Sequence, residues 1–177
     1  RQRNFTMSHL YLGPSFTAGY IKRMLNSRNI AFKELEDSEL VRFTAERLSE
    51  NKIIGWFQGK MEFGPRALGN RSILANPCFD NIKDILNSKI KKREEFRPYA
   101  PAVLEERAKD FFDISCISPY MLLAPKAREE KREIIPGITH VDGSARLQTV
   151  SRSTNPKFWN LIKAFEGITT VPVLINT

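Results

Sequence analysis

The fold class is decided by residues 52–59, Lys-Ile-Ile-Gly-Trp-Phe-Gln-Gly, an apolar run that ends in glycine. Its length and its β-branched and aromatic side chains predict a buried strand. Apolar side chains recur at helical spacing from Asp37 to Glu50, so we expect a helix there, capped by Asp37 or Ser38. Residues 30–35 alternate weakly in polarity and are expected to form another strand. A strand, a helix and a strand in this order predict an α/β domain.

The segments on either side continue this alternation. The remaining expected elements are a short strand at 9–12, a helix from the Thr17 cap to Ser27, a helix from Asn81 to Lys92, an extended segment at 94–104, a helix end at 107–112, a strand at 120–124, a charged loop at 126–133, a turn leading into a strand at 139–150, a helix from Pro156 to Phe165 capped by Asn155, and a buried strand at 171–177. The predicted fold is thus a single α/β domain with a twisted open sheet flanked by helices. Residues 1–7 are polar and are expected to form a frayed lead-in, which leaves 8–177 for the domain. An apolar strand at the end of the sequence favours a domain that is truncated at its C-terminus.

The composition excludes several classes of protein. Hydrophobic residues make up 41% of the chain and charged residues 27%, which is enough for a packed core and argues against global disorder. The apolar runs are far too short to span a bilayer and no secretory signal opens the sequence, so we expect a cytoplasmic protein with no membrane partner. Two cysteines, Cys78 and Cys116, exclude a disulfide framework and a four-cysteine zinc site.

The charge points to an anionic partner. The chain has 28 basic and 20 acidic residues, a net charge of +8. Residues 66–97 hold eight Lys or Arg and four acids, and so supply half of that surplus. Nucleic acids, phosphorylated metabolites and acidic lipids are the partners that such a surplus favours.

Arginines in apolar or glycine-rich surroundings are the candidate ligands for this anion. Arg66 follows Gly64 and Pro65, and Arg146 lies between Ala145 and Leu147. Arginine in such a frame is expected to be buried against an anion, and its planar fork matches phosphate oxygens. Each of them taken alone fits an internal salt bridge equally well. Together they predict a phosphate pocket where the loops at 59–75, 91–98 and 140–148 meet, with Arg66, Lys91, Arg97 and Arg146 in the first rank and Arg71, Ser72, Arg93, Gln148 and His140 in the second.

Catalytic motifs are scarce in the sequence. It holds no HExxH, no paired CxxC, no GxSxG and no Walker-type loop. His140 and Asp142 lie near a turn, and a histidine bonded to backbone fits that position as well as a functional role does. No metal site is expected within this chain, and no catalytic residue is assigned.

Residues 61–75, Met-Glu-Phe-Gly-Pro-Arg-Ala-Leu-Gly-Asn-Arg-Ser-Ile-Leu-Ala, resemble the C-terminal region of the nodulation-type (NodU-like) O-carbamoyltransferases. The resemblance continues through residues 90–101, 139–150 and 171–177, and residues 9–14 also fit the family. Four long blocks in the same order are a specific signal and cover most of the chain from Lys52 onward.

This resemblance implies a YrdC-like domain that binds carbamoyl phosphate and makes carbamoyl adenylate with ATP. The carbamoyl group would then pass to a hydroxyl of a sugar-like acceptor. The implied partner is the protein's own larger N-terminal domain of the ASKHA type (an actin-like ATPase fold), which would share the ATP and hold a divalent metal such as Mg or Fe. The family's Lys-x-Arg pattern matches Lys91 to Arg93, whereas its Ser-x-Asn pattern would follow Thr177. We therefore expect a transferase that is inactive as this fragment alone, and the sequence permits a homodimer of the full-length protein.

Two other functions remain open from the sequence. A basic, YrdC-like nucleic-acid-binding module is the first, because aromatic residues flank the basic blocks and could stack on bases. The second is a domain whose basic loops serve mainly to dock its N-terminal partner. The aromatic residues concerned are Trp56, Phe57, Phe63, Phe96 and Tyr99.

Overall fold

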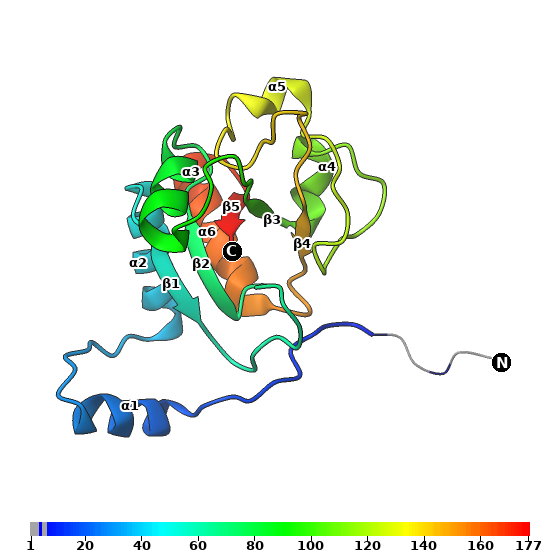
Figure 1. Cartoon of the computed structure of the whole chain (residues 1–177). Coiled ribbons are helices and arrows are strands. Elements are labelled where there is room, and N and C mark those ends of the chain that lie inside the picture. The colour runs from blue at the N-terminus through cyan, green and yellow to red at the C-terminus, as the bar shows by residue number, and fades with distance from the viewer. Residues whose placement is uncertain (1–3, 5–6) are drawn as a thin grey trace.

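The computed structural model describes Asn4 and residues 7–177, so most of the predicted lead-in lies outside the described residues. A single open sheet has the strand order β1-β2-β5-β3-β4 within this part of the chain. The strands are β1 (Ile54–Phe57), β2 (Arg71–Ala75), β3 (Ala100–Leu104), β4 (Gln148–Val150) and β5 (Val173–Asn176). The helices are α1 (Ala18–Ser27), α2 (Asp37–Ser49), α3 (Ile82–Ile85), α4 (Ala108–Phe111), α5 (Glu129–Arg132) and α6 (Pro156–Thr169), with a π-helical turn at Leu86–Lys91 and a 3-10 turn at Glu105–Arg107. The predicted α/β class with one open sheet is confirmed (Figure 1).

The central strand, β5, determines where a site can form. It is antiparallel to both β2 and β3, whereas β3 and β4 are parallel. Asn176, near the end of β5, is paired with Leu74 of β2 and with Ala100 of β3. The C-terminal end of β5 therefore lies between β2 and the start of β3. Every residue of β5 is buried, as its continuous apolar sequence predicts.

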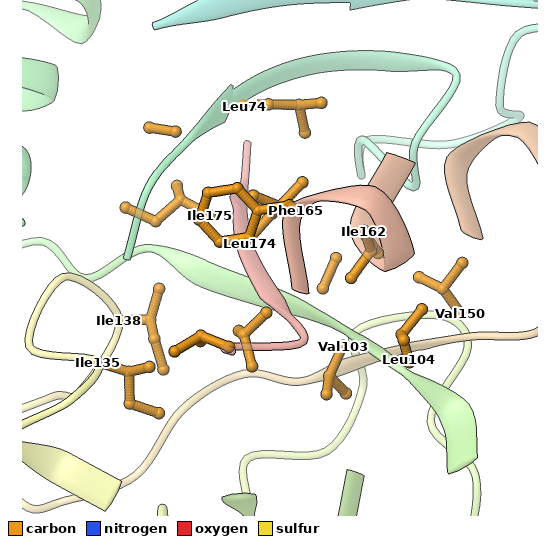
Figure 2. Close-up of a cluster of buried hydrophobic side chains, with 14 of the residues drawn as sticks. Leu74, Val103, Leu104, Ile135, Ile138, Val150, Ile162, Phe165, Leu174 and Ile175 are labelled. Atoms are coloured by element: carbon orange, nitrogen blue, oxygen red, sulfur yellow. The ribbon is translucent and has the colours of Figure 1, made fainter. Parts of the chain in front are cut away.

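The helix α6 covers one face of the sheet, and α2 packs beside it (Figure 1). Its buried side chains Phe158, Leu161, Ile162 and Phe165 recur at helical spacing. In Figure 2, Ile162 and Phe165 lie on one side of the β3 ribbon, and Ile135 and Ile138 lie on the other. Burial of each such side chain contributes about 1.5–3 kcal/mol to the stability of the fold. Packing on both sides therefore stabilises the sheet.

Capping residues set the helix starts, with one exception to the prediction. Asn155 caps α6 by accepting a hydrogen bond from the backbone N–H of Phe158 (3.2 Å), and Thr17 caps α1 in the same way. The expected cap of α2 was wrong. Asp37 is already the first helical residue, and the preceding Glu36 makes no capping side-chain bond. The Asp37 carboxylate lies instead in the first turn, where its negative charge interacts favourably with the helix dipole.

Three predicted strands are absent from the described structure. Residues 9–12 are irregular because they bond to the loop at 61–63, where Phe63 N–H donates to the Leu10 carbonyl. Residues 30–35 carry mostly exposed side chains and pair with no strand. Residues 120–124 make only a single bridge, between Leu123 and Leu147.

The segments that the sequence pattern placed in loops also differ in part. β2 occupies the second half of the predicted binding loop at 59–75, and α5 lies within the predicted charged loop. The expected helix from Asn81 becomes π-helical after Ile85 and ends at Lys92, whose φ of 49° is left-handed. The helix α1 has no buried residue and lies away from the sheet (Figure 1). None of the helices in the described part of the chain is long and apolar enough to cross a membrane.

Candidate functional site

A pocket of about 420 Å³ opens at the C-terminal end of β5. The loop before β2, the π-helical turn, the start of β3 and the turn before β4 supply its walls. A second hollow of about 480 Å³ shares Arg66, Arg93 and Arg146 with it, so the two adjoin. Residues of the loops at 59–75, 91–98 and 140–148 line these two hollows together. The pocket is lined by Gly64, Pro65, Arg66, Ala67, Arg71, Ile73, Lys91, Arg93, Pro98, Tyr99, Ala100, Met121, Arg146, Asn176 and Thr177.

The loop that carries Arg66 requires a glycine at its end. Gly69 has a φ of 104°, and a Cβ at this position would lie 2.3 Å from the ring of Phe158. The chain can therefore pass over the start of α6 and enter β2 only without a side chain here.

Four cations of the pocket have no acidic partner among the residues that the structure describes. No carboxylate in this part of the chain lies within ion-pair distance of Arg66, Lys91, Arg93 or Arg146. Burial, together with the nearby charges of Arg66 and Arg93, lowers the pKa of Arg146. Burial and the charge of Arg93 also lower the pKa of Lys91. The cations repel one another, and an anion between them would relieve that repulsion.

Arg93 is held in place by neutral groups. Its Nε donates to Asn87 Oδ1 (2.8 Å), and its guanidinium lies 4.7 Å from the centre of the Tyr99 ring. The Tyr99 hydroxyl donates to the same Asn87 oxygen (2.7 Å), and burial raises the pKa of Tyr99. These contacts orient the Arg93 fork and leave its charge uncompensated.

Other candidate residues are partly or wholly engaged elsewhere. Arg97 lines only the second hollow and pairs with Glu94 (2.8 Å). Arg71 lines the pocket, but its Nε donates to Glu62 (3.1 Å). Ser72 is buried beneath the loop, where its hydroxyl accepts from the Gly69 N–H (3.0 Å), and it does not line either hollow.

His140 lines the second hollow, with its Nδ1 3.2 Å from Asp142. Hydrogen bonds from Ser144 lower the pKa of Asp142 to about 2, so this carboxylate is ionised at neutral pH. His140 and the ionised Asp142 therefore both face the second hollow.

The expectation that apolar frames bury the arginines was wrong. Arg66, Arg97 and Arg146 are exposed at the mouth of the two hollows. Ala145 and Leu147 are buried on either side of Arg146 because successive side chains of an extended segment point in opposite directions. Ala145 and Leu147 thus pack into the core, and Arg146 faces the two hollows.

Asn176 is a pocket residue that the sequence analysis missed. Gln148 Nε2 donates to the Leu68 carbonyl (2.9 Å), which turns Gln148 Oε1 toward Asn176 Nδ2 (2.8 Å). Asn176 Nδ2 also donates to the Ala67 carbonyl (3.2 Å). The amide orientation of Asn176 is thereby fixed, and its Oδ1 is buried with no donor among the described residues.

This unsatisfied oxygen belongs to a residue that lines the pocket. A buried acceptor without a donor is unfavourable by about 1–3 kcal/mol, so a ligand N–H at this position would relieve the penalty. Gln148, a second-rank candidate, lies beneath Asn176 and acts as its support rather than as part of the wall. The only sequence signal for Asn176 was an amide at the end of an apolar strand.

The described residues contain no group of three His, Cys, Asp or Glu side chains that could hold a metal ion. Two of the five aromatic residues considered for base stacking, Trp56 and Tyr99, are buried. Phe57, Phe63 and Phe96 are exposed.

Comparison with known proteins identifies the family. A family model described as "Carbamoyltransferase C-terminus" matches residues 45–177. The chain belongs to this family. All three loops of the pocket lie within the matched residues, whereas α1 lies outside them. The predicted family is confirmed.

Relatives of this carbamoyltransferase C-terminus are much longer proteins. The chain is 41% identical over 193 residues to the uncharacterized protein sll1178 of Synechocystis sp., covering 97% of the chain and 31% of that protein. It is 51% identical over 136 residues to the nodulation protein NolO of Bradyrhizobium diazoefficiens, covering 75% of the chain and 25% of NolO. The nodulation protein U of Sinorhizobium fredii is 39% identical over 168 residues, with 95% of the chain and 28% of that relative covered. The chain thus spans less than a third of each of these relatives.

Proposed function

We propose that this domain binds carbamoyl phosphate in the pocket at the end of β5 and serves carbamoyl transfer within a longer protein. The observation that carries the proposal is the combination of Arg66, Lys91 and Arg146, cations without acidic partners, with Asn176, a buried acceptor without a donor. Carbamoyl phosphate has complementary groups, because one end is a phosphate dianion and the other is an amide-like NH₂.

The two ends of the ligand would find different partners in one pocket. Arg66, Arg146 and Lys91 would contact the phosphate oxygens, with Arg93 behind them. Asn176 Oδ1 would accept a hydrogen bond from the carbamoyl NH₂. Cations held in place before the ligand arrives stabilise the charge on a departing phosphate with little reorganisation.

No nucleophile from the protein is needed for the reaction that the family resemblance implies. Water would cleave carbamoyl phosphate to carbamate and inorganic phosphate. A carbamate oxygen would then attack the α-phosphorus of ATP, forming carbamoyl adenylate and releasing pyrophosphate. An acceptor hydroxyl, sugar-like in this proposal, would finally take the carbamoyl group and release AMP.

The second hollow is suited to the ATP phosphates, because Arg66, Arg93 and Arg146 face both spaces and Arg97 lines the second. The remainder of the ATP site, the acceptor site and any Mg or Fe would belong to an N-terminal ASKHA-type domain of the full-length protein. A cytoplasmic location accompanies this proposal, since ATP and carbamoyl phosphate are cytoplasmic metabolites.

Titration calorimetry of the full-length protein tests the proposed ligand. Phosphonoacetamide, a stable mimic of carbamoyl phosphate, and inorganic phosphate serve as a matched pair of probes. Asn176→Ala should weaken phosphonoacetamide binding by about tenfold and leave phosphate binding nearly unchanged, because the lost acceptor faces only the amide end. Equal weakening of both probes, or of neither, would contradict the proposed role of Asn176.

A further inference from the structure

The loop that carries Arg66 is folded around a buried carboxylate. The Glu62 side chain has 0% of its surface exposed. Its Oε1 accepts hydrogen bonds from the backbone N–H groups of Leu68 (2.7 Å), Asn70 (2.8 Å) and Arg71 (3.2 Å). A carboxylate oxygen that accepts from three backbone N–H groups is rigidly held.

The second oxygen of the same carboxylate closes the other side of the loop. Glu62 Oε2 accepts from Arg71 Nε (3.1 Å), and Arg71 Nη2 donates to the Gly64 carbonyl (3.0 Å). The segment from Glu62 to Arg71 is therefore tied at both ends to one side chain. Arg66 lies in the middle of this segment, and its own guanidinium bonds to no described residue. Only the backbone of the loop sets its position.

The same loop also holds the Asn176 side chain in place. The Ala67 carbonyl accepts from Asn176 Nδ2, and the Leu68 carbonyl accepts from Gln148 Nε2. Both carbonyls lie within the segment that Glu62 ties together. A shift of this loop would therefore displace Arg66 and Asn176 together.

We propose that Glu62 is a positioning residue that sets the place of Arg66, and through Ala67 that of Asn176, in the anion pocket. The inference rests on the proposed function, because it concerns the same pocket. Glu62 itself does not line the pocket and does not touch the ligand. A displacement of a binding group by about 1 Å can cost two orders of magnitude in function, so the effect of the tie is measurable.

The test is a double-mutant cycle in the full-length protein, with the dissociation constant of phosphonoacetamide as the readout. Glu62→Gln keeps the volume and one carbonyl oxygen but turns an NH₂ group toward the donors of Arg71. We expect it to weaken binding about tenfold in the wild-type background and by a clearly smaller factor in the Arg66→Ala background, where only the displacement of Asn176 is left to act. Coupling of this kind identifies residues that act through one another.

A matched control separates positioning from general destabilisation. Glu166, on α6, is also a buried acid, 8% exposed. It pairs with Lys163 of the same helix and with Arg107 of the 3-10 turn. Glu166→Gln should lower the melting temperature and leave the dissociation constant unchanged. If Glu62→Gln does not fold, Glu62→Asp replaces it in the cycle with the same expectations, because the charge stays and the shorter side chain cannot reach all four donors.

The outcomes are distinguishable. Equal weakening by Glu62→Gln in both backgrounds, or no weakening in the wild type, overturns the positioning role. If Arg66→Ala alone leaves phosphonoacetamide binding unchanged, the proposed function of Arg66 fails, whatever Glu62 does. A strong effect of Glu62→Gln in the wild type that becomes clearly smaller in the Arg66→Ala background supports both proposals.

Discussion

Replacement of Arg146 by alanine should have opposite effects on binding and on the stability of the empty protein. Partial burial and the nearby charges of Arg66 and Arg93 lower the pKa of Arg146, so its positive charge is unfavourable in the fold. Because Arg146 is exposed, its side chain adds little packing. Arg146→Ala should therefore leave the free energy of unfolding within about 0.5 kcal/mol of the wild type, or raise it.

The loss in binding is larger. Arg146 would supply a charge-assisted hydrogen bond to the ligand phosphate, and such a bond contributes about 1.5–3 kcal/mol. Since the side chain remains exposed at the mouth of the pocket, solvent screening favours the lower end of this range. A loss of about 1.4 kcal/mol corresponds to about a tenfold rise in the dissociation constant.

The assay is chemical denaturation of the full-length protein, with and without phosphonoacetamide, beside calorimetry. Arg107→Ala is the matched control, because Arg107 pairs with Asp110 and with the buried Glu166 far from the pocket. Its loss should destabilise the empty protein by about 1–3 kcal/mol and leave binding unchanged. If Arg146→Ala behaves like Arg107→Ala, Arg146 is a structural arginine and the reasoning is wrong.

Three further perturbations follow from the described contacts. Lys91 has a lowered pKa in the fold, so the unfolded chain binds more protons just below its ordinary pKa of 10.5, and the free energy of unfolding of the empty protein should rise with pH there. The free energy of unfolding is measured by urea titration at several pH values. A Lys91→Met variant whose free energy of unfolding still rises with pH as in the wild type would contradict the role given to Lys91. Gly69→Ala should destabilise the protein by about 1–3 kcal/mol in thermal melts, because φ is 104° and the new Cβ would meet Phe158; a neutral result would show that the loop relaxes freely. Asn155→Ala should cost about 2 kcal/mol, since Asn155 both caps α6 and accepts from Gln58 (2.7 Å), and a loss below about 0.5 kcal/mol in denaturation would refute the shared role.

Local chemistry explains which elements were predictable. The strand at β1 and the start of α6 follow from short-range signals, an apolar run closed by glycine and an Asn-Pro cap. β2 was missed because its sequence, Arg-Ser-Ile-Leu-Ala, shows no regular alternation of polar and apolar residues; its strand conformation comes from pairing with β1 on one side and with β5, about a hundred residues away, on the other. The predicted strand at 9–12 failed for the converse reason, since its bonds go to an irregular loop.

The residues of the candidate site also differ in whether the sequence could predict them. Arg66 and Arg146 could be named from their neighbours, and the structure brings both to one pocket. Their exposure could not be predicted, because it depends on which side of an extended segment faces the core. Asn176 was out of reach of sequence reasoning, since its free oxygen results from bonds to Gln148 and Ala67, which are distant in the chain.

The most direct measurement is a crystal structure of the full-length protein with bound phosphonoacetamide. The account predicts the phosphonate within hydrogen-bond distance of Arg66 and Arg146, and the amide nitrogen on Asn176 Oδ1. A phosphonate bound elsewhere, or an amide end that points away from Asn176 into solvent, would contradict it.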